Sequence, residues 1–562
     1  MFARVHLPMR RKAHFRKRYC VLTWFRGWAS SPRGFDLYWV QEALFIPMRC
    51  AEYRDSLVHA LRLRVVLRRS ALVCTLLVSG CTVGPDFLTP PAPSVEKYLP
   101  DERPAREGRG GPAAGLAAGL VFGADVSAQW WRHFGSAELN RLIEAGIAQN
   151  ADLQTAEAAL RVAQANVVVQ RGALFPTVGL GFNSSSQRVS QTLSAPTPSG
   201  DYLYSLHTGQ VNVAFSPDIW GGTRRQIESA EAQARASAFQ REAAYLSLTA
   251  NIALAAVQEA SLRGQIAATT RIISAQEQLL GILRKQNSAG QIALPDVVAQ
   301  ETAVAQARLL LPTLERQLGQ QRNLLAVLTG RFPGEGVKGS FSLRSFRLPH
   351  KIPLSLPADL VRNRPDIRIA EENLHAANAL IGTAIANRLP QITLSASAGS
   401  SAASLGRLLS PETGFWTIAG NAAQTVFDAG TLAARQQSAE EFTTQTASQY
   451  RSTVLMAFQN VADTLRALQS DARALDAAIA AEGAASRNLD LLRKQVDAGQ
   501  ISLPLLLNAQ QAYLQTALAR VQAEAQRIAD TVALFQALGG GWWNRPGPLV
   551  PPLDPVPVVA AN

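Results

Sequence analysis

The residue types that most often perform chemistry are sparse in this chain, and their spacing assembles no reaction centre. Gly539-Gly540-Gly541 lacks the Lys and Ser/Thr of a phosphate-binding loop. The sequence offers no catalytic group made of a nucleophile, a general base and a residue that orients that base. The histidines beyond residue 81 show no metal-ligand spacing: His133, His207, His350 and His375. We therefore predict no catalytic residue, no metal site and no cofactor, and expect a protein that is not an enzyme.

Cys81 is the one residue whose surroundings predict a covalent role. It follows the small residues Ser79 and Gly80, a short apolar run over 71–78, and a basic region with four arginines, Arg62, Arg64, Arg68 and Arg69. This order is typical of a bacterial lipoprotein signal, in which the cysteine sulfur becomes thioether-linked to a lipid. Thr82 favours sorting to the outer membrane, because an aspartate there would favour inner-membrane retention. The alternative is an ordinary buried cysteine after an apolar segment.

The positive charge of the chain lies almost entirely in its first 80 residues. The 562 residues carry a net charge of +13, and residues 1–80 contain 15 Lys/Arg and 4 Asp/Glu, a net of +11. Removal of this stretch would leave a nearly neutral product with Cys81 as its only cysteine. This excludes a disulfide scaffold and a charge-driven partnership with nucleic acid.

The rest of the chain contains two tandem copies of one structural unit. Residues 283–286 (Leu-Arg-Lys-Gln) recur at 492–495, and residues 289–292 (Ala-Gly-Gln-Ile) recur at 498–501, both at an offset of 209. Each copy begins with a helical segment, about 136–172 and about 366–388, followed by two strand-like runs. These runs are 177–182 with 203–215, and 391–396 with 415–427. Tandem duplication therefore sets the architecture.

Each copy continues with a very long helical region. No proline occurs between Thr223 and Leu294, nor between Thr431 and Leu503, and both regions are rich in Ala, Gln, Glu, Leu and Arg. A continuous helix of such length would reach about 100 Å. Each helix then breaks at a Gly-x-x-x-Leu-Pro turn, and a second helix returns. A plain antiparallel coiled coil in a soluble scaffold protein is the alternative interpretation of the helices alone.

The strands favour a membrane pore shared between chains. Aromatic residues lie near the strand ends, as at a membrane interface: Phe175, Phe182, Tyr202, Tyr204, Phe215, Trp220, Phe415, Trp416 and Phe427. A sheet in lipid must close, because an open edge leaves backbone groups without hydrogen bonds. Single-chain barrels begin at about eight strands, so four strands per chain predict a shared barrel. A small soluble β-subdomain capping a coiled coil is the alternative.

Five motifs in order complete the pattern. They are Cys81-Thr-Val-Gly-Pro-Asp86; Arg364-Pro-Asp366 with Ala370-Glu371 and Leu374; Phe427-Asp-Ala-Gly430; Leu507-Asn-Ala-Gln-Gln511; and Ala537-Leu-Gly-Gly-Gly-Trp542. Through these motifs the sequence resembles the TolC-like outer-membrane efflux proteins, specifically the NodT-type lipoprotein branch associated with RND pumps. The resemblance covers residues 81 to about 543.

The resemblance implies a fold, partners and a function. The fold class would be an α+β membrane protein, in which a homotrimer forms a twelve-stranded outer-membrane β-barrel continued by a periplasmic α-helical barrel. The partners would be a periplasmic adaptor (membrane fusion) protein, an inner-membrane RND transporter and outer-membrane lipid. The function would be that of a passive exit duct for drugs or other small molecules in a tripartite system of a Gram-negative bacterium. Alternatives are the duct of a type I protein secretion system, or a periplasmic coiled-coil adaptor lipoprotein.

The same resemblance assigns the two helix turns to a periplasmic tip. Candidate adaptor contacts are Gly290, Gln291, Leu294, Pro295, Gly499, Gln500, Leu503 and Pro504, and candidate gate residues are Asp296, Leu505 and Asn508. Relatives often carry aspartates where this chain has Leu505 and Asn508, so a ring of Asn508 would be less cation-selective. Asp296 has two other interpretations, a helix cap after Pro295 or an adaptor-facing surface residue.

These interpretations divide the chain into six parts. They are a non-native or mis-started N-terminal extension (1–60), a lipoprotein signal peptide (61–80), an extended N-terminal segment (81–125), a first repeat (126–340), a second repeat (341–541) and a Pro-rich tail (542–562). Within the third part, residues 101–120 have the composition of a low-complexity insertion.

Overall fold

The computed structural model describes residues 82–95, 97–100, 119–190, 192, 202–349, 351–498 and 500–551. All of them belong to the unit Thr75–Asn562. The predicted extension over 1–60, the predicted signal peptide over 61–80 and the predicted lipidation site Cys81 lie outside the described residues.

The duplication is visible in the lengths of the elements. The long helices α4 (Gly222–Ser288) and α8 (Thr431–Asp497) have 67 residues each, and the returning helices α5 (Leu294–Leu328) and α9 (Leu503–Ala537) have 35 each. Each long helix is preceded by a 22-residue helix, α3 (Ala151–Gly172) or α7 (Pro365–Ala386), and by two strands. The predicted unit of strands and helical hairpin is therefore confirmed.

Local chemistry explains where the long helices begin. Gly221 and Gly430, at φ of +77° and +86°, occupy the left-handed conformation just before α4 and α8. Asp218 then accepts hydrogen bonds from the backbone N–H groups of Thr223 and Arg224, both at 2.9 Å. Asp428 accepts from Gly430 and Leu432. Both acids satisfy donors that a helix start leaves unpaired.

The predicted helix over 136–172 is wrong in one respect, because it is two helices. α2 (Ala137–Gln149) ends at Asn150, which also caps α3. The Asn150 side chain accepts from the N–H of Leu153 and donates to the carbonyl of Leu328. Since Leu328 is the last residue of α5, this bend ties the start of the unit to the end of the helical hairpin.

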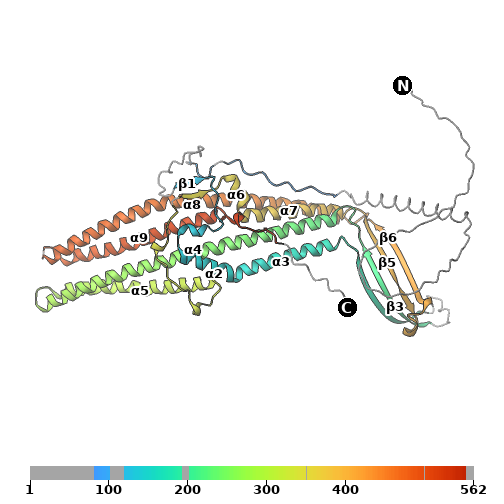
Figure 1. Cartoon of the computed structure of the whole chain (residues 1–562), viewed down its shortest axis with the longest axis horizontal. Helices are drawn as coiled ribbons and strands as arrows, with labels where there is room; N and C mark the ends of the chain where they lie inside the picture. Colours follow the sequence, from blue (N-terminus) through green and yellow to red (C-terminus); the bar gives the residue numbers. More distant parts are fainter. Residues whose placement is uncertain are drawn as a thin grey trace, which may run out of the picture. The chain divides into compact units, whose positions relative to one another are not determined.

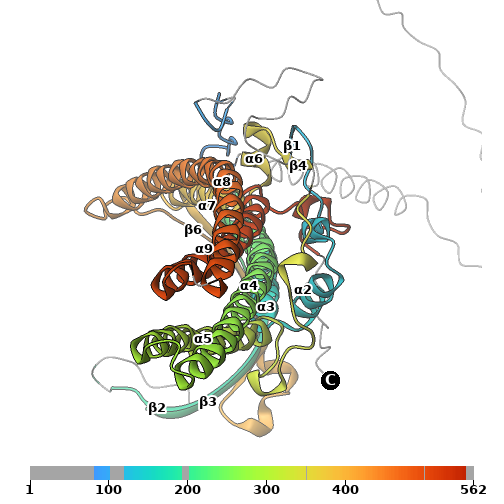
Figure 2. The same ribbon diagram turned by 90° about the vertical axis from the view of Figure 1, so that its left-hand side faces the viewer.

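The helices pack in pairs along their length. α4 packs on α3, α5, α7 and α9, and α8 packs on α7 and α9. Figure 1 shows the hairpins α4–α5 and α8–α9 running in one direction, and Figure 2 shows them from the tip. Alanine is the most frequent residue on the buried face of α4, with Ala232, Ala250, Ala253, Ala256 and Ala260 among the buried alanines. Small residues of this kind allow close helix approach.

The main core lies where both copies meet, away from the hairpin tips. Trp130 of η1 (Trp130–Phe134) stacks on Phe535 of α9, with ring centroids 5.5 Å apart. Both side chains are almost fully buried. Beside this core, β1 (Gly119–Phe122) pairs in parallel with β4 (Lys351–Leu354), followed by α6 (Pro357–Asn363). The sequence interpretation of 101–120 as an insertion missed the start of β1.

The second sheet lies at the opposite end of the helices from the tips (Figure 1). Its four strands are β2 (Thr177–Arg188), β3 (Leu203–Phe215), β5 (Gln391–Ala402) and β6 (Gly414–Ala423), in the order β2-β3-β5-β6. All neighbours are antiparallel. β6 is shorter than the predicted run over 415–427. Its last residue, Ala423, pairs with Gln391, and the residue before Gln391 is Pro390, which has no N–H to continue the ladder.

Candidate functional site

The four-stranded sheet has one apolar and one polar face. Residues directly opposite each other on adjacent strands share a face, so the register assigns every position. One face carries Val178, Leu180, Phe182, Val211, Val213, Ala396, Ala398, Trp416 and Ile418. The other carries the polar residues Thr177, Asn183, Thr208, Gln210, Asn212, Ser395, Ser397, Ser401 and Thr417, together with the aromatic Phe415 opposite Gly399. Such a sheet can separate an apolar medium from an aqueous one.

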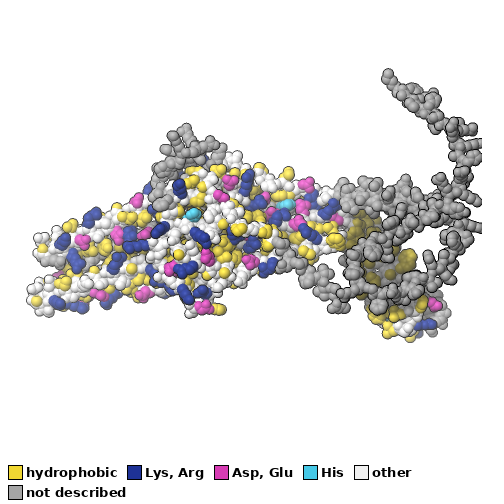
Figure 3. Space-filling view, in the orientation of Figure 1, with side chains coloured by type: hydrophobic (Ala, Val, Ile, Leu, Met, Phe, Trp, Pro, Cys, Tyr) yellow, Lys and Arg dark blue, Asp and Glu magenta, His cyan; other side chains and the backbone are white. Residues whose placement is uncertain are grey.

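The apolar face is uncovered in the single chain. Leu180 is 87% exposed, Ile418 76% and Trp416 74%. On the face shown in Figure 3, charged side chains are scattered over the helices, whereas hydrophobic side chains dominate the visible part of the sheet. Contiguous apolar surface of this kind marks a contact with lipid or with another protein.

The apolar face ends partway along the strands. Phe182 pairs with Gly209, and in the next pair on the same face the Ser184 hydroxyl lies 2.8 Å from Nδ1 of His207. Ser186 and Ser205 follow, with their hydroxyls 3.3 Å apart. The register runs from Thr177 to Arg188 without a bulge. Within this continuous ladder the alternation of β3 changes parity at Gly209: Val211 and Val213 lie on the apolar face, whereas Tyr204 and Leu206 lie on the opposite face.

The two tip turns share one backbone hydrogen bond at equivalent positions. In the first, the N–H of Gly290 donates to the carbonyl of Asn287, and the N–H of Gln291 donates to that of Gln286 at 2.9 Å. Gly290 has a φ of +71°. In the second turn, the N–H of Gln500 donates to the carbonyl of Gln495 at the same distance. The first pair of bonds is that of a Schellman motif, which ends a helix and turns the chain sharply.

Most predicted contact residues of the tip are on its surface. Gly290, Gln291, Leu294 and Pro295 are exposed, and so are Gln500 and Pro504. Leu503 is different, because its side chain is only 7% exposed and packs in a cluster with Leu279, Leu283 and Leu506. Gly499 lies outside the described residues.

The predicted gate residues lie on the first turns of the returning helices. Asp296 is half-buried in the first turn of α5. Leu505 and Asn508 are exposed and three residues apart on α9, so they share one face of that helix. The adjacent face buries Leu503, Leu506, Ala509 and Gln510. The structure thus places Leu505 and Asn508 away from the packing of their own chain.

The segment that follows Cys81 is held on the helices next to the sheet. We name residues 82–87 the anchor strap. The guanidinium of Arg225, whose side chain is 5% exposed, donates to the carbonyls of Val83 and Gly84 and to the carboxylate of Asp86. The ring of Phe87 stacks on His375 of α7, with centroids 4.3 Å apart. The sequence analysis missed this clamp, because nothing in the spacing of these residues pairs them.

A pair of carboxyl groups lies between α8 and α9. Burial, together with a hydrogen bond to Asp530 and the negative charge of that residue, raises the pKa of Asp471 to about 7, and the nearby Arg527 only partly opposes this. One oxygen of Asp471 has no hydrogen-bond partner. Near neutral pH this carboxyl pair therefore holds a proton between the two helices of the second hairpin.

Two other features are absent from the described residues. No group of three or more His, Cys, Asp or Glu side chains in these ranges is arranged to hold a metal ion. No helix within the same ranges combines the length and apolarity that crossing a membrane requires.

Comparison with known proteins finds the same architecture elsewhere. The model of the family "Outer membrane efflux protein" matches residues 142–331 and 356–540. The chain is 30% identical over 482 residues to the probable efflux pump outer membrane protein TtgC of Pseudomonas putida KT2440, covering 85% of this chain and 96% of TtgC. Among solved structures, the outer-membrane channel OprN matches with a TM-score of 0.73 at 25% identity, over 82% of this chain and all of OprN. The open-state MtrE channel of Neisseria gonorrhoeae matches with a TM-score of 0.69 at 26% identity, over 82% and 99%.

Proposed function

Because this chain belongs to the outer membrane efflux protein family, we propose that three copies of it close one barrel in the outer membrane. The protein is an outer-membrane efflux channel of the RND type, a passive transport duct and not an enzyme. It works in a tripartite assembly with an adaptor and an inner-membrane transporter.

The observation that supports the trimer is the four-stranded sheet, which has one apolar face, one polar face and two open edges. Among the described strands, β2 and β6 each pair on one side only. In lipid such edges need partners, and four strands are too few to close on themselves. With three copies, β2 of one would pair with β6 of the next, which places twelve strands in one ring. The apolar face would meet lipid and the polar face would line the pore.

The anchor strap supports lipidation of Cys81. The Arg225 clamp brings residue 82 to the junction between the helices and the sheet, so a lipid on the preceding sulfur would enter the membrane beside the barrel. Mass spectrometry of the mature N-terminus should find a diacylglyceryl thioether on Cys81, and Cys81→Ala should lose it. An unmodified N-terminus elsewhere would refute this anchor.

The tip residues support a docking and gating role at the periplasmic end. In this proposal the exposed turns around Gly290 and Gln500 contact the adaptor, and Asp296, Leu505 and Asn508 lie near the constriction. Leu503 would act from the interior, because its packing against Leu279 and Leu283 of α4 would hold the second turn against the first hairpin.

The oligomeric state and transport test the proposal together. The full chain, extracted from outer membranes in mild detergent, should have the protein mass of a trimer by light scattering. Deletion of its gene should sensitise cells to several unrelated toxic compounds, and the wild-type gene should restore resistance. A monomer in detergent would refute the shared barrel. Loss of a secreted protein with unchanged drug resistance would instead support a type I secretion duct.

A further inference from the structure

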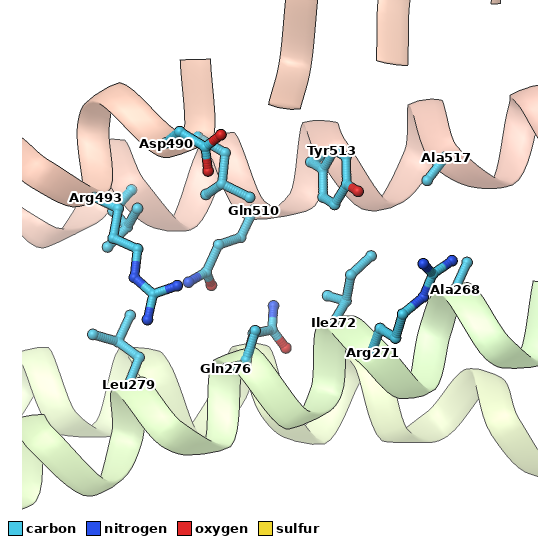
Figure 4. Close-up of a pocket in the computed structure, with 13 residues that line it drawn as sticks. Ala268, Arg271, Ile272, Gln276, Leu279, Asp490, Arg493, Gln510, Tyr513 and Ala517 are labelled. Carbon is cyan, nitrogen blue, oxygen red and sulfur yellow. The ribbon is translucent and has the colours of Figure 1, made fainter. Parts of the chain in front are cut away.

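A cavity of about 140 Å³ lies between the two helical hairpins of one chain. We name it the seam cavity. Its walls come from α4, α8 and α9 (Figure 4), and they include the apolar side chains of Ile272, Leu279 and Leu506. Because the cavity lies within a single chain, it does not depend on the proposed trimer.

Two glutamines reach into the seam cavity from opposite sides. Gln276 of α4 is 4% exposed and Gln510 of α9 is 7% exposed, and Figure 4 shows their amides directed into the gap. The Oε1 atoms of both are buried and have no hydrogen-bond partner. Buried polar groups are nearly always hydrogen-bonded. If either amide were turned over, its NH₂ group would need a partner in the same place. The two side chains therefore mark a missing polar partner inside the cavity.

The charges around the seam cavity restrict the chemistry of that partner. Arg493 lines one end and Arg271 lines the α4 side, which disfavours an ammonium group. The two carbonyl oxygens and the carboxylate of Asp490 disfavour an anion. A hydroxyl is neutral and can donate to one glutamine while accepting from another group. The apolar walls require the rest of the molecule to be apolar.

The volume of the seam cavity restricts the size of the ligand. A protein cavity of about 150 Å³ lined by apolar side chains accommodates one benzene ring. Tyr513 lines the same cavity and offers an aromatic face or edge to such a ring. We propose that the seam cavity is a binding site for a small neutral amphiphile of the phenol class, whose hydroxyl donates to the Oε1 of one glutamine and accepts from the NH₂ group of the other, with that second amide turned over. Bound there, the ligand bridges the first helical hairpin to the second.

Fluorine NMR with 4-fluorophenol tests the site on the full chain in detergent, with fluorobenzene as the probe without a hydroxyl. The wild-type protein should bind 4-fluorophenol saturably. The double variant Gln276→Leu/Gln510→Leu should bind 4-fluorophenol at least tenfold more weakly. Its affinity for fluorobenzene should stay at the wild-type level. Ala517→Leu, which adds volume at a wall residue that is 4% exposed, should abolish binding of both probes.

Matched controls separate the cavity from partition into detergent. Gln278→Leu/Gln511→Leu changes two exposed glutamines of the same helices and should leave binding at the wild-type level. The milder Gln276→Met supplies a second variant if the double variant does not fold. Signals that do not saturate, or that are equal in wild type and Ala517→Leu, would overturn the proposal and leave the cavity with water alone. Equal affinity of wild type and Gln276→Met for 4-fluorophenol would also overturn it.

Discussion

Gly84 of the anchor strap and Gly382 of α7 pack backbone against backbone. A Cβ atom added at Gly84 would lie 2.4 Å from the Cα of Gly382, and one added at Gly382 would lie 2.6 Å from the carbonyl oxygen of Val83. No side chain fits between the two segments. The strap can therefore reach the Arg225 clamp only because both positions are glycine.

The first prediction concerns this contact. Gly382→Ala should destabilise the protein by about 1–3 kcal/mol, because the new methyl group overpacks the contact with the strap. Thermal unfolding in detergent and the rate of proteolysis within 82–95 would measure the effect. The matched control is Gly281→Ala on α4, where a Cβ meets no atom within 4 Å. That change should leave stability equal or raise it by up to about 1 kcal/mol. A Gly382→Ala protein that unfolds and is cleaved like wild type would contradict the packing.

The second prediction concerns pH. The pKa of Asp471 is raised from 3.8 to about 7, so the folded protein holds a proton that the unfolded chain releases. The resulting stabilisation is complete below about pH 4 and is lost as the pH rises to about 7. Asp530→Asn removes the neighbouring charge, so its melting temperature should fall less between pH 5 and pH 8 than that of wild type. Asp476→Asn, an exposed change on α8, the helix that carries Asp471, should follow the wild-type profile. Parallel profiles for wild type and Asp530→Asn would reject this assignment.

The third prediction separates the faces of the sheet. Leu180→Lys places a charge on the apolar face and should cost about 2–4 kcal/mol if that position lies near the bilayer midplane. The amount of protein assembled in outer-membrane fractions should therefore drop. Asn212→Lys, on the polar face, should assemble normally and change the ion selectivity of the pore. If both variants assembled equally, the assignment of lipid and pore faces would be wrong.

The fourth prediction concerns the tip. Asn508→Asp should shift the reversal potential of single channels in a KCl gradient toward cation selectivity, because a ring of carboxylates would form at an exposed position of α9. Asn323→Asp, exposed on α5 and remote from the tip in sequence, serves as the control. Unchanged selectivity of Asn508→Asp would remove this residue from the constriction.

The sequence predicted the elements whose signals are local. The duplicated Gly-x-x-x-Leu-Pro turns located both hairpin tips, and the proline-free regions that begin at Thr223 and Thr431 located both long helices. The break at Asn150 was missed, because its partner Leu328 is 178 residues away in the chain. The core contact between Trp130 and Phe535 and the carboxyl pair of Asp471 and Asp530 also join distant segments. Such contacts depend on how distant segments pack together, and the hydrophobic periodicity of the sequence does not predict them.

In the proposed trimer, the open edges of β2 and β6 have a genetic consequence. A copy whose edge strand cannot pair prevents closure of every barrel that it joins, because each barrel needs both edge strands of all three copies. In a cell that makes normal and damaged copies equally, only about one three-membered ring in eight would contain normal copies alone. Edge-strand lesions are therefore expected to be dominant over the intact allele, whereas a null allele, which contributes no chain at all, is recessive.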